Sequence, residues 1–375
     1  MAKQFLLSDQ TLFRDVDVFE IDYVPEFFNY REPQMSELAY QISPALRGGR
    51  ALNAICTGLP GTGKTTSVLR VFTELEQFRG KVLPVYVNCQ TDRTKYMVYS
   101  RVYATLFGHT PPRTGLSILS VMDAIGDSLQ KRKLSLVVCL DDANLLHYDG
   151  VLGDVLNSLL RLHQDYPGVR TGVFATISDI DLDLVTDLDP WVVSVFRPTM
   201  IYFPPYDADE IRGILRERVR AGLYPKVLSP EMFDIIVEQT MESGDVRVGL
   251  DLVKRAAMHA ERAARTEVVR EDIMAAYEQA RHVHLVCTVR ALSAGERLLF
   301  RQIAELSQEQ TEPLISKNIY AAVKDTAKIG YTVFFKRLQK LNSLRLVDMI
   351  RVRSSDRTNE IVLRYEPEKV REVCG

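Results

Sequence analysis

The sequence has few of the features that mark secreted, disulfide-bonded or membrane proteins. It holds five cysteines in 375 residues, each far from the next. That spacing fits neither a zinc pattern nor a disulfide framework, so we interpret the cysteines as small buried hydrophobic residues. No apolar run approaches the ~20 residues of a membrane span, and residues 1–10 lack a signal-peptide core. We therefore expect a cytoplasmic protein without a membrane partner.

The chain also lacks a strong net charge. Its formal charge is −2, which argues against a nucleic-acid-binding surface that covers the whole protein. The charge is uneven, however: residues 290–375 carry 16 Lys and Arg against 11 Asp and Glu, or +5, which leaves −7 for the rest. By this count the C-terminal part alone is basic.

What the sequence does contain is a glycine-rich stretch, GLPGTGKTT at residues 58–66, between an apolar run and a segment with helical spacing. A strand, a glycine-rich loop and a helix are the context that a G-x-x-x-x-G-K-[ST] motif requires. Backbone N–H groups of such a loop turn toward a phosphate, and the helix N-terminus favours its negative charge. We expect Lys64 to reach the β and γ phosphates and the Thr65 hydroxyl to ligate Mg²⁺. The stretch predicts a site for ATP or ADP, formed by Gly61, Thr62, Gly63, Lys64, Thr65 and Thr66.

Two carboxylates end the apolar run at residues 134–142, LSLVVCLDD. Ligands bind at the carboxyl ends of parallel strands, so Asp141 and Asp142 should face the phosphate loop. We expect Asp141 to hold the Mg²⁺ water shell and Asp142 to act as general base, with Lys64 as the third catalytic candidate. The alternative is that the pair only caps the next helix. Because Asp is one carbon shorter than Glu, we predict slow hydrolysis.

Strand-like and helix-like segments alternate up to residue 203, which predicts an α/β class with a parallel sheet covered by helices. After Pro204 and Pro205, helical patterns at 209–221, 229–241, 245–266 and 270–285 predict a helical second domain. We therefore expect three domains: a nucleotide-binding core with an N-terminal arm at 1–204, a helical domain at 205–285 and a C-terminal domain at 286–375.

The C-terminal domain should be a winged helix. Helical patterns at 292–306, 315–327 and 332–341 precede two strand-like segments at 346–353 and 360–364. In this plan the third helix enters the DNA major groove and the hairpin contacts the backbone or the minor groove. A charged but merely solvated helix face is the alternative. The candidate contacts are Thr332, Lys336, Arg337 and Lys340 on the helix, and Arg351, Arg353 and Arg357 on the hairpin.

Several motifs together resemble one family, the AAA+ replication initiators of the archaeal origin-recognition and cell-division-cycle type. The resemblance covers nearly the whole chain. It implies an AAA+ core, a helical lid domain and a C-terminal winged helix. The matching segments are Tyr23-Val-Pro-Glu with Arg31-Glu32 and Gln34, GLPGTGKTT, VYVNCQTDRTKY at 85–96, FPPYDADEI at 203–211 and SGDVR at 243–247.

The resemblance also implies roles for residues that the pattern alone would not single out. Val24, Pro25 and Arg31 would flank the adenine, Tyr206 and Arg218 of the lid would close the pocket, and Arg247 would read the γ-phosphate. The loop with Arg113, Thr114 and Gly115 would touch duplex DNA beside the winged helix. The implied partners are double-stranded origin DNA and the replicative helicase or other initiator subunits.

Some positions depart from the family pattern. Asp142 stands where the family usually has Glu, Ser178 or Asp179 replaces a polar sensor Asn, and Trp191 replaces an arginine after Asp189-Pro190. Arg197 is a substitute that the spacing does not require. Because losing an arginine finger can cost ~10³ in rate, we expect tight nucleotide binding with weak ATPase activity at most.

Our leading interpretation is an initiator whose bound nucleotide acts as a conformational switch for duplex DNA binding. A rival is an interaction protein that regulates or recruits the helicase, with the winged helix contacting protein. A third is an active motor ATPase, which fast turnover would indicate.

Overall fold

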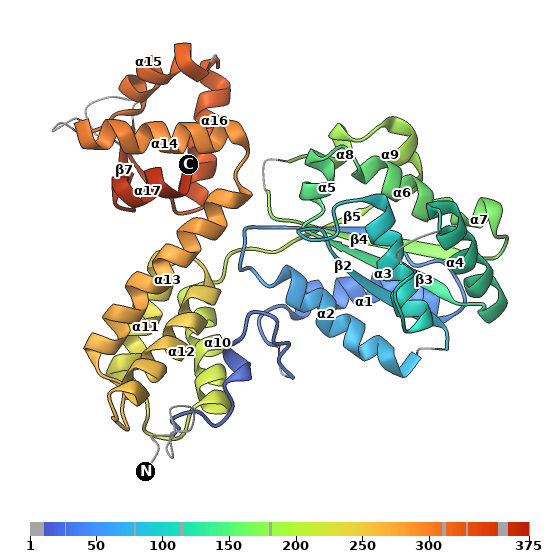
Figure 1. The fold of residues 1–375 in the computed structure, drawn as a ribbon, viewed down its shortest axis with the longest axis horizontal. Coiled ribbons are helices and arrows are strands. Elements are labelled where there is room, and N and C mark those ends of the chain that lie inside the picture. Colours follow the sequence, from blue (N-terminus) through green and yellow to red (C-terminus); the bar gives the residue numbers. More distant parts are fainter. Residues whose placement is uncertain are drawn as a thin grey trace. The chain divides into compact units, whose positions relative to one another are not determined.

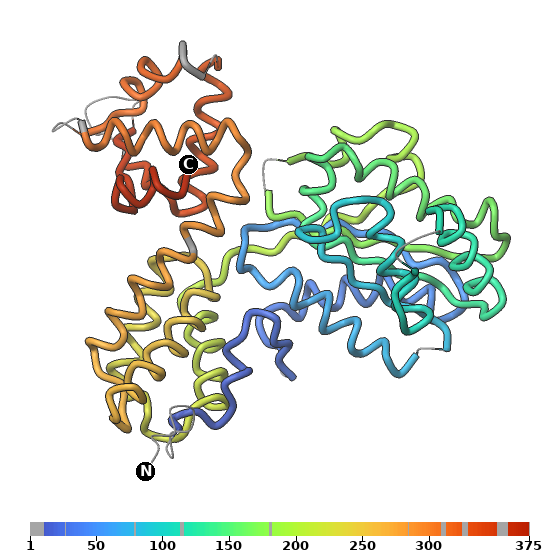
Figure 2. Tube along the Cα trace, in the orientation of Figure 1, coloured from blue at the N-terminus to red at the C-terminus, as the bar shows by residue number. Residues whose placement is uncertain are grey.

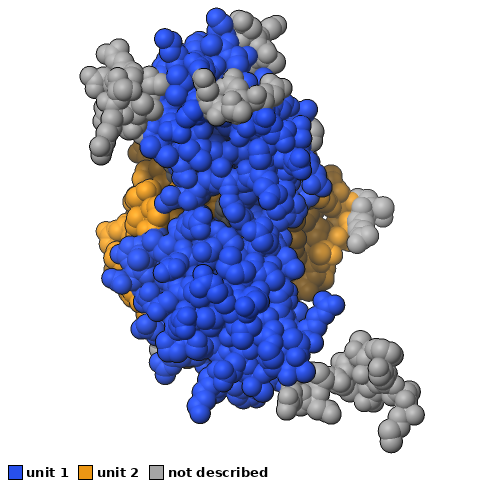
Figure 3. Space-filling model, turned by 90° about the vertical axis from the view of Figure 1, so that its left-hand side faces the viewer, with its two compact units in different colours: residues 1–23, 206–375 blue, residues 24–205 orange. Residues whose placement is uncertain are grey.

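A five-stranded parallel sheet forms the centre of residues 24–205 (Figure 1). The computed structural model describes residues 11–26, 28–78, 80–112, 116–179, 182–309, 313–327, 329–351 and 359–374. The chain divides into two units, residues 24–205 and residues 1–23 with 206–375 (Figure 3).

The order of the strands places the phosphate loop and the Asp pair close together. The sheet order is β2-β3-β4-β1-β5, with β1 (Ala54–Thr57), β2 (Val82–Asn88), β3 (Ser135–Asp141), β4 (Arg170–Ile177) and β5 (Thr199–Tyr202). Every neighbouring pair is parallel, so all five carboxyl ends lie at one edge. Only β4 separates the loop after β1 from Asp141 at the end of β3. The predicted α/β class is confirmed.

Helices cover both faces of this sheet. Alternate side chains of β3 enter two different hydrophobic clusters, Val138 on one face and Val137 on the other. The first face is covered by α3 (Lys95–Phe107), α4 (Ile118–Arg132), α6 (Leu152–Leu160) and α9 (Pro190–Phe196), and the second by α1 (Glu32–Leu46) and α2 (Lys64–Leu75). The short helices are η2 (Glu76–Phe78), α5 (Asn144–Tyr148), α7 (Leu162–Asp165) and α8 (Leu184–Asp187).

The helical domain has its own core, and the N-terminal arm belongs to it. Its helices are α10 (Ala208–Gly222), α11 (Pro230–Ser243), α12 (Val246–Arg262) and α13 (Arg270–Ala291). Leu12, Val18 and Phe19 of the arm, the last two in η1 (Asp17–Phe19), are buried in the same cluster as Leu215. Figure 2 shows the arm beside α10, and Phe13 forms a β-bridge with Leu223. The expected domain at 1–204 included the arm, but the apolar residues of the arm are buried against the lid helices instead.

The C-terminal domain follows the predicted order of three helices and a hairpin. Its elements are α14 (Ala294–Glu309), α15 (Ser316–Ala327), α16 (Tyr331–Ser343), β6 (Val347–Arg351), β7 (Asn359–Leu363) and an unpredicted α17 (Pro367–Cys374). The domain boundary expected at 285/286 falls inside α13, which is one continuous helix from the lid cluster to the C-terminal cluster. Within the described ranges, no helix is long and apolar enough to cross a bilayer.

Candidate functional site

The phosphate loop runs from the end of β1 to Lys64, the first residue of α2. Gly63 has φ +89°, a left-handed conformation that favours glycine, and a Cβ at Gly58 would lie 2.4 Å from the Phe203 carbonyl oxygen. Lys64 is 5% exposed, and its Nζ donates to the carbonyls of Gly58 at 2.7 Å and Leu59 at 2.9 Å. The ammonium group is therefore folded over the loop in which a phosphate would bind.

The buried Arg31 side chain holds the phosphate loop through hydrogen bonds to backbone carbonyls. The side chain is 2% exposed, and Nε donates to the Thr62 carbonyl at 2.9 Å. The two other nitrogens donate to the carbonyls of Tyr30 and Pro204, each at 2.7 Å. A buried guanidinium directed at backbone carbonyls fixes the loop, so the structure gives Arg31 a positioning role in addition to the adenine contact that the resemblance implies. Val24 and Pro25 lie in the preceding segment, partly buried.

Asp141 is the centre of a hydrogen-bond network that joins three strands and α2. It is 6% exposed, and its carboxylate accepts from Thr65 at 2.8 and 3.0 Å, from Tyr86 at 2.8 Å and from Thr176 at 2.6 Å. Burial raises the pKa of Asp141, and so does neighbouring Asp142, while the hydroxyl donors oppose the shift. The sequence pattern does not single out Tyr86 and Thr176 as partners of Asp141, although each is a polar residue in an apolar strand.

Asp142 is held in a different way. Its backbone has φ +56°, which is uncommon for a residue with a side chain, and its N–H donates to the Thr176 hydroxyl at 2.9 Å. One carboxylate oxygen accepts from the Ser178 hydroxyl and the other from Gln90 Nε2, both at 2.8 Å. Ser178, one of the two candidates for the sensor position, thus contacts the candidate base, and Gln90 is a second contact that the sequence pattern does not single out.

The donor set suits Mg²⁺. This ion prefers oxygen ligands, and it usually takes one or two carboxylates with phosphates and water. Thr65 and Asp141 supply a hydroxyl and a carboxylate within hydrogen-bond distance of each other, at the phosphate loop. Among the described residues, no group of three or more His, Cys, Asp or Glu side chains could hold a metal ion. The residues present therefore fit an ion shared with a triphosphate.

The lid residues that the resemblance names lie in the other unit. Arg218 donates to the Val18 carbonyl at 3.0 Å, and its Cζ lies 4.7 Å from the Tyr23 ring centroid. Burial lowers the pKa of Arg218. Arg218 therefore ties the arm to α10, and Tyr206 lies two residues before the first residue of that helix. Arg247, near the start of α12, pairs with Asp245, its Nη2 2.5 Å from the carboxylate.

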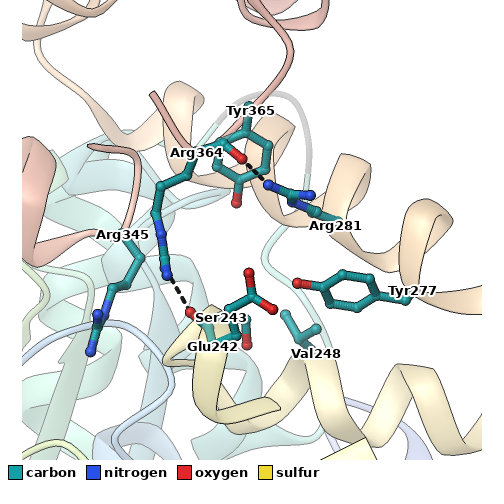
Figure 4. A pocket seen from close by; sticks show the side chains of 8 residues that line it. All are labelled: Glu242, Ser243, Val248, Tyr277, Arg281, Arg345, Arg364 and Tyr365. Carbon is teal, nitrogen blue, oxygen red and sulfur yellow. Dashed lines mark hydrogen bonds between the residues drawn. The ribbon is translucent and has the colours of Figure 1, made fainter. Parts of the chain in front are cut away.

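The end of α11 and the start of α12, which carries Arg247, meet the hairpin of β6 and β7, here called the wing, around a small pocket (Figure 4). Arg364, which follows β7, donates to the Glu242 carbonyl at 2.7 Å and pairs with Asp348 of β6 at 2.9 Å. Arg281 of α13 donates to the Arg364 carbonyl and lies 5.0 Å from the Tyr365 ring centroid. The wing thus rests on the end of α11, three residues before Asp245.

The candidate DNA contacts are only partly within the described residues. Arg113, Thr114, Gly115, Arg353 and Arg357 lie outside them, and Arg351 is the last residue of β6. On α16, Thr332 and Lys336 are exposed. Arg337 is partly buried, and its guanidinium lies against Gly295 at the start of α14.

Lys340 is a correction to the predicted set. Its side chain is only 8% exposed, and Nζ lies 2.9 Å from a Glu296 oxygen whose side chain is 11% exposed. Position 340 borders the buried stripe of Phe334, Leu338 and Leu341, so the lysine turns toward α14. It does not offer its charge to a surface ligand.

Comparisons with known proteins agree with this architecture. An AAA domain model matches residues 47–177, and a Cdc6 AAA+ ATPase-type lid domain model matches residues 212–278. ORC1-type DNA replication protein 6 of Halobacterium salinarum is 42% identical over 355 residues, 95% of this chain and 93% of that protein. The chain belongs to the ORC1-type DNA replication proteins. ORC1-type DNA replication protein 2 of Methanothermobacter thermautotrophicus is 39% identical over 100% of this chain and 97% of its own length.

Solved structures of this family have the same fold. The Aeropyrum pernix ORC1 protein in complex with DNA matches with a TM-score of 0.67 and 26% identity, over 98% of this chain and 97% of that one. The Aeropyrum pernix ORC2 protein, in a structure of ADPNP and ADP complexes, matches with a TM-score of 0.73 and 24% identity over 97% of each chain. The ORC1-type fold accounts for the AAA+ core, the lid and the C-terminal domain.

Proposed function

We propose that this protein is a DNA replication initiator that binds ATP or ADP with Mg²⁺ and binds duplex DNA through its winged helix. The observation that carries the proposal is the arrangement of Lys64, Thr65 and Asp141 at one sheet edge, in a chain of the ORC1 type. Such an arrangement serves phosphate and Mg²⁺. A family member of known structure is described as bound to DNA.

In this proposal the phosphates occupy the loop of Gly61 to Thr66, and Lys64 exchanges its carbonyl partners for phosphate oxygens. Thr65 and Asp141 hold the ion, which neutralises phosphate charge when bound. Asp142 orients the attacking water, but two hydrogen bonds and a short side chain limit its action. Val24, Pro25 and Arg31 line the base side, and Tyr206, Arg218 and Arg247 are the lid's contribution. The nucleotide acts mainly as a conformational ligand, with slow hydrolysis.

DNA contact is assigned to Thr332, Lys336 and Arg337 of α16, to the hairpin arginines Arg351, Arg353 and Arg357, and to the loop of Arg113 to Gly115. The replicative helicase and other initiator subunits are further partners in this proposal. Exposed cations on a third helix and its wing suit the major groove and the phosphate backbone.

A duplex titration over a range of salt concentrations tests the DNA-binding claim. The double variant Lys336→Ala with Arg337→Ala should bind more weakly, with a salt slope shallower by roughly 1.8, because each phosphate contact contributes about 0.9. Equal affinity and equal slope would reject the winged helix as the DNA-binding surface.

The burial of Lys340 gives some support to the second candidate, an interaction protein that recruits or regulates the helicase. Because Lys340 is paired with Glu296, the surface of the C-terminal domain that would bind DNA has one exposed cation fewer than the sequence predicts. Weak, salt-insensitive DNA binding by the wild type would favour that candidate.

A further inference from the structure

Basic side chains gather at the sheet edge where the strands begin, opposite the edge that carries the phosphate loop. Because all neighbouring pairs are parallel, the starts of the five strands lie together. Each strand begins at, or within four residues after, a basic residue. These are Arg50 before β1, Lys81 before β2, Arg132 and Lys133 before β3, Arg170 at the start of β4 and Arg197 before β5.

The strand register makes these residues spatial neighbours. Ser135 is opposite Val82 on one side and opposite Arg170 on the other, and its N–H donates to the Lys81 carbonyl at 2.9 Å. Arg50 Nε donates to the Thr171 carbonyl at 2.7 Å, which ties β1 to the start of β4. With ~4.8 Å between strands, the five strand starts extend over ~19 Å.

Most of these cations are exposed and have no acidic partner. Arg47, Lys81, Arg132, Lys133, Arg170 and Arg197 are exposed, and no ion pair joins any of them to a carboxylate of the described residues. Arg50 is partly buried and donates to backbone carbonyls only.

The neighbouring segments supply few carboxylates to this edge. On the turns of the helices nearest the strand starts, the carboxylates are Glu74, Glu76, Asp123, Asp127 and Asp165. Among these, Glu74 lies 3.6 Å from Arg70, Asp127 lies 3.9 Å from Lys131, and Asp123 accepts a hydrogen bond from Tyr166. Asp141, Asp142, Asp149 and Asp179 lie instead at or after the carboxyl ends of the strands. Cations therefore outnumber carboxylates at the edge where the strands begin, although the charges of residues 24–205 as a whole nearly cancel.

We propose that this basic edge, formed by Arg47, Arg50, Lys81, Arg132, Lys133, Arg170 and Arg197, binds the phosphate backbone of duplex DNA. It would be a second contact surface, separate from the winged helix, and it rests on the DNA binding proposed above. Each DNA strand carries one phosphate per about 3.4 Å, so a ~19 Å row of cations spans about five or six phosphates.

The chemistry of the edge favours DNA over a protein partner. Protein interfaces depend on buried apolar and aromatic anchors at their centre. The large exposed apolar side chains beside these strand starts are Leu52, Phe78 and Met200, which lie on three separate segments. Cations on the starts of packed strands can reach phosphates without entering a groove, so the contact should not depend on base sequence.

A charge-reversal variant of the full-length protein tests the proposal. It carries Lys81→Glu, Arg132→Glu, Lys133→Glu and Arg170→Glu, all exposed and remote from the phosphate loop. The matched control carries Arg220→Glu, Lys226→Glu, Arg262→Glu and Arg270→Glu on exposed positions of the lid, with the same change in net charge. Duplex affinity is measured over a range of KCl concentrations, with ADP present, on two unrelated sequences.

The edge variant should bind both duplexes at least about tenfold more weakly, with a salt slope shallower by roughly 0.9 for each phosphate contact removed. Its ADP affinity and thermal midpoint should match those of the wild type, and the control should retain most of its DNA affinity. An unchanged slope and affinity, or an equal loss in the control, would overturn the basic edge alone. Failure of the wild type to bind duplex would overturn the proposed function as well.

Discussion

The Thr65 hydroxyl lies 2.8 and 3.0 Å from the two carboxylate oxygens of Asp141. One residue comes from the helix that follows the phosphate loop and the other from the end of β3, so the contact joins the two motifs that the sequence placed 76 residues apart. Tyr86 and Thr176 complete the shell around the carboxylate. The proposed nucleotide site is therefore preorganised on helices and strands of the core.

Removing the Thr65 hydroxyl should weaken binding of the Mg²⁺ complex specifically. Thr65→Ala should lower MgATP affinity about tenfold or more, since a hydrogen bond to a charged group is worth ~1.5–3 kcal/mol. Thr65→Ser retains the hydroxyl and should bind nearly as well as the wild type. Calorimetric titration with and without Mg²⁺ measures both; a Thr65→Ala protein with undiminished MgATP affinity would contradict this assignment.

Lengthening the candidate base should raise turnover. Asp142→Glu carries its carboxylate one carbon further toward an attacking water, so we expect faster ATP hydrolysis than in the wild type. Asp142→Asn should reduce the residual rate at least about tenfold while leaving ADP affinity unchanged. Phosphate release under saturating ATP measures the rates. If all three proteins hydrolyse ATP equally, Asp142 is not the base.

The two lysines of α16 should respond differently to substitution. Lys336→Ala should weaken DNA binding and leave stability unchanged, because the side chain is exposed. Lys340→Met should destabilise the C-terminal domain by roughly 3–5 kcal/mol, because it leaves the Glu296 carboxylate buried without its partner.

The double variant Lys340→Met with Glu296→Gln should recover part of that loss, which urea unfolding measures. A Lys340→Met protein as stable as the wild type, but defective in binding duplex, would restore Lys340 as a DNA contact.

Asp272 should contribute to the acid sensitivity of the lid. Burial opposes ionisation of its carboxyl group, but hydrogen bonds from Arg265 and from the Val269 N–H outweigh it and lower the pKa of Asp272 from its ordinary value. The stability that this group adds is fully present above about pH 4 and is lost as the pH falls through the folded-state pKa. Asp272→Asn should therefore destabilise the protein at pH 7, with a difference from the wild type that shrinks below pH 4. Urea midpoints at several pH values test this, and a constant difference would count against it.

Arg364 should hold the wing against the lid. Arg364→Gln removes the Asp348 pair and the hydrogen bond to the Glu242 carbonyl. We expect a loss of roughly 1–3 kcal/mol in unfolding free energy and faster proteolysis near the junction. Arg301→Gln is a suitable control, because its partner Glu305 lies on the same helix, α14. Equal protease resistance of the Arg364→Gln and control proteins would show that the junction does not depend on Arg364.

The helices and strands of the core could be predicted from the sequence because their hydrophobic periodicity and the residues that begin and end them are local features. α3, for example, occupies Lys95–Phe107, where Thr94 caps its start and Gly108 its end. Lys64, Thr65, Asp141 and Asp142 could be proposed as site residues because the motif and the strand pattern carry them.

Other features depend on packing between segments and could not be predicted in the same way. Lys340 looked like a surface cation, but its partner Glu296 lies 44 residues earlier. Tyr86 could not be told apart from the other residues of a buried strand, although its hydroxyl donates to Asp141. The arm shows no helical or strand periodicity in its sequence because it packs against the lid as irregular chain. The extension of α13 to Ala291 could have been predicted from the sequence. Ser293 and Glu296 form a capping box, which indicates that a new helix, α14, begins just after residue 293.

The central claim is that the nucleotide at the Lys64 loop alters how the protein engages duplex DNA. The most direct measurement is duplex affinity with ADP, with a non-hydrolysable ATP analogue and without nucleotide, for the wild type and Lys64→Ala. The wild type should show dissociation constants that differ by about fivefold or more between nucleotide states, as expected for a coupling free energy of ~1 kcal/mol or more, and Lys64→Ala should show a single value. A wild type with one affinity in every state, or a Lys64→Ala protein that keeps the difference, would contradict the account.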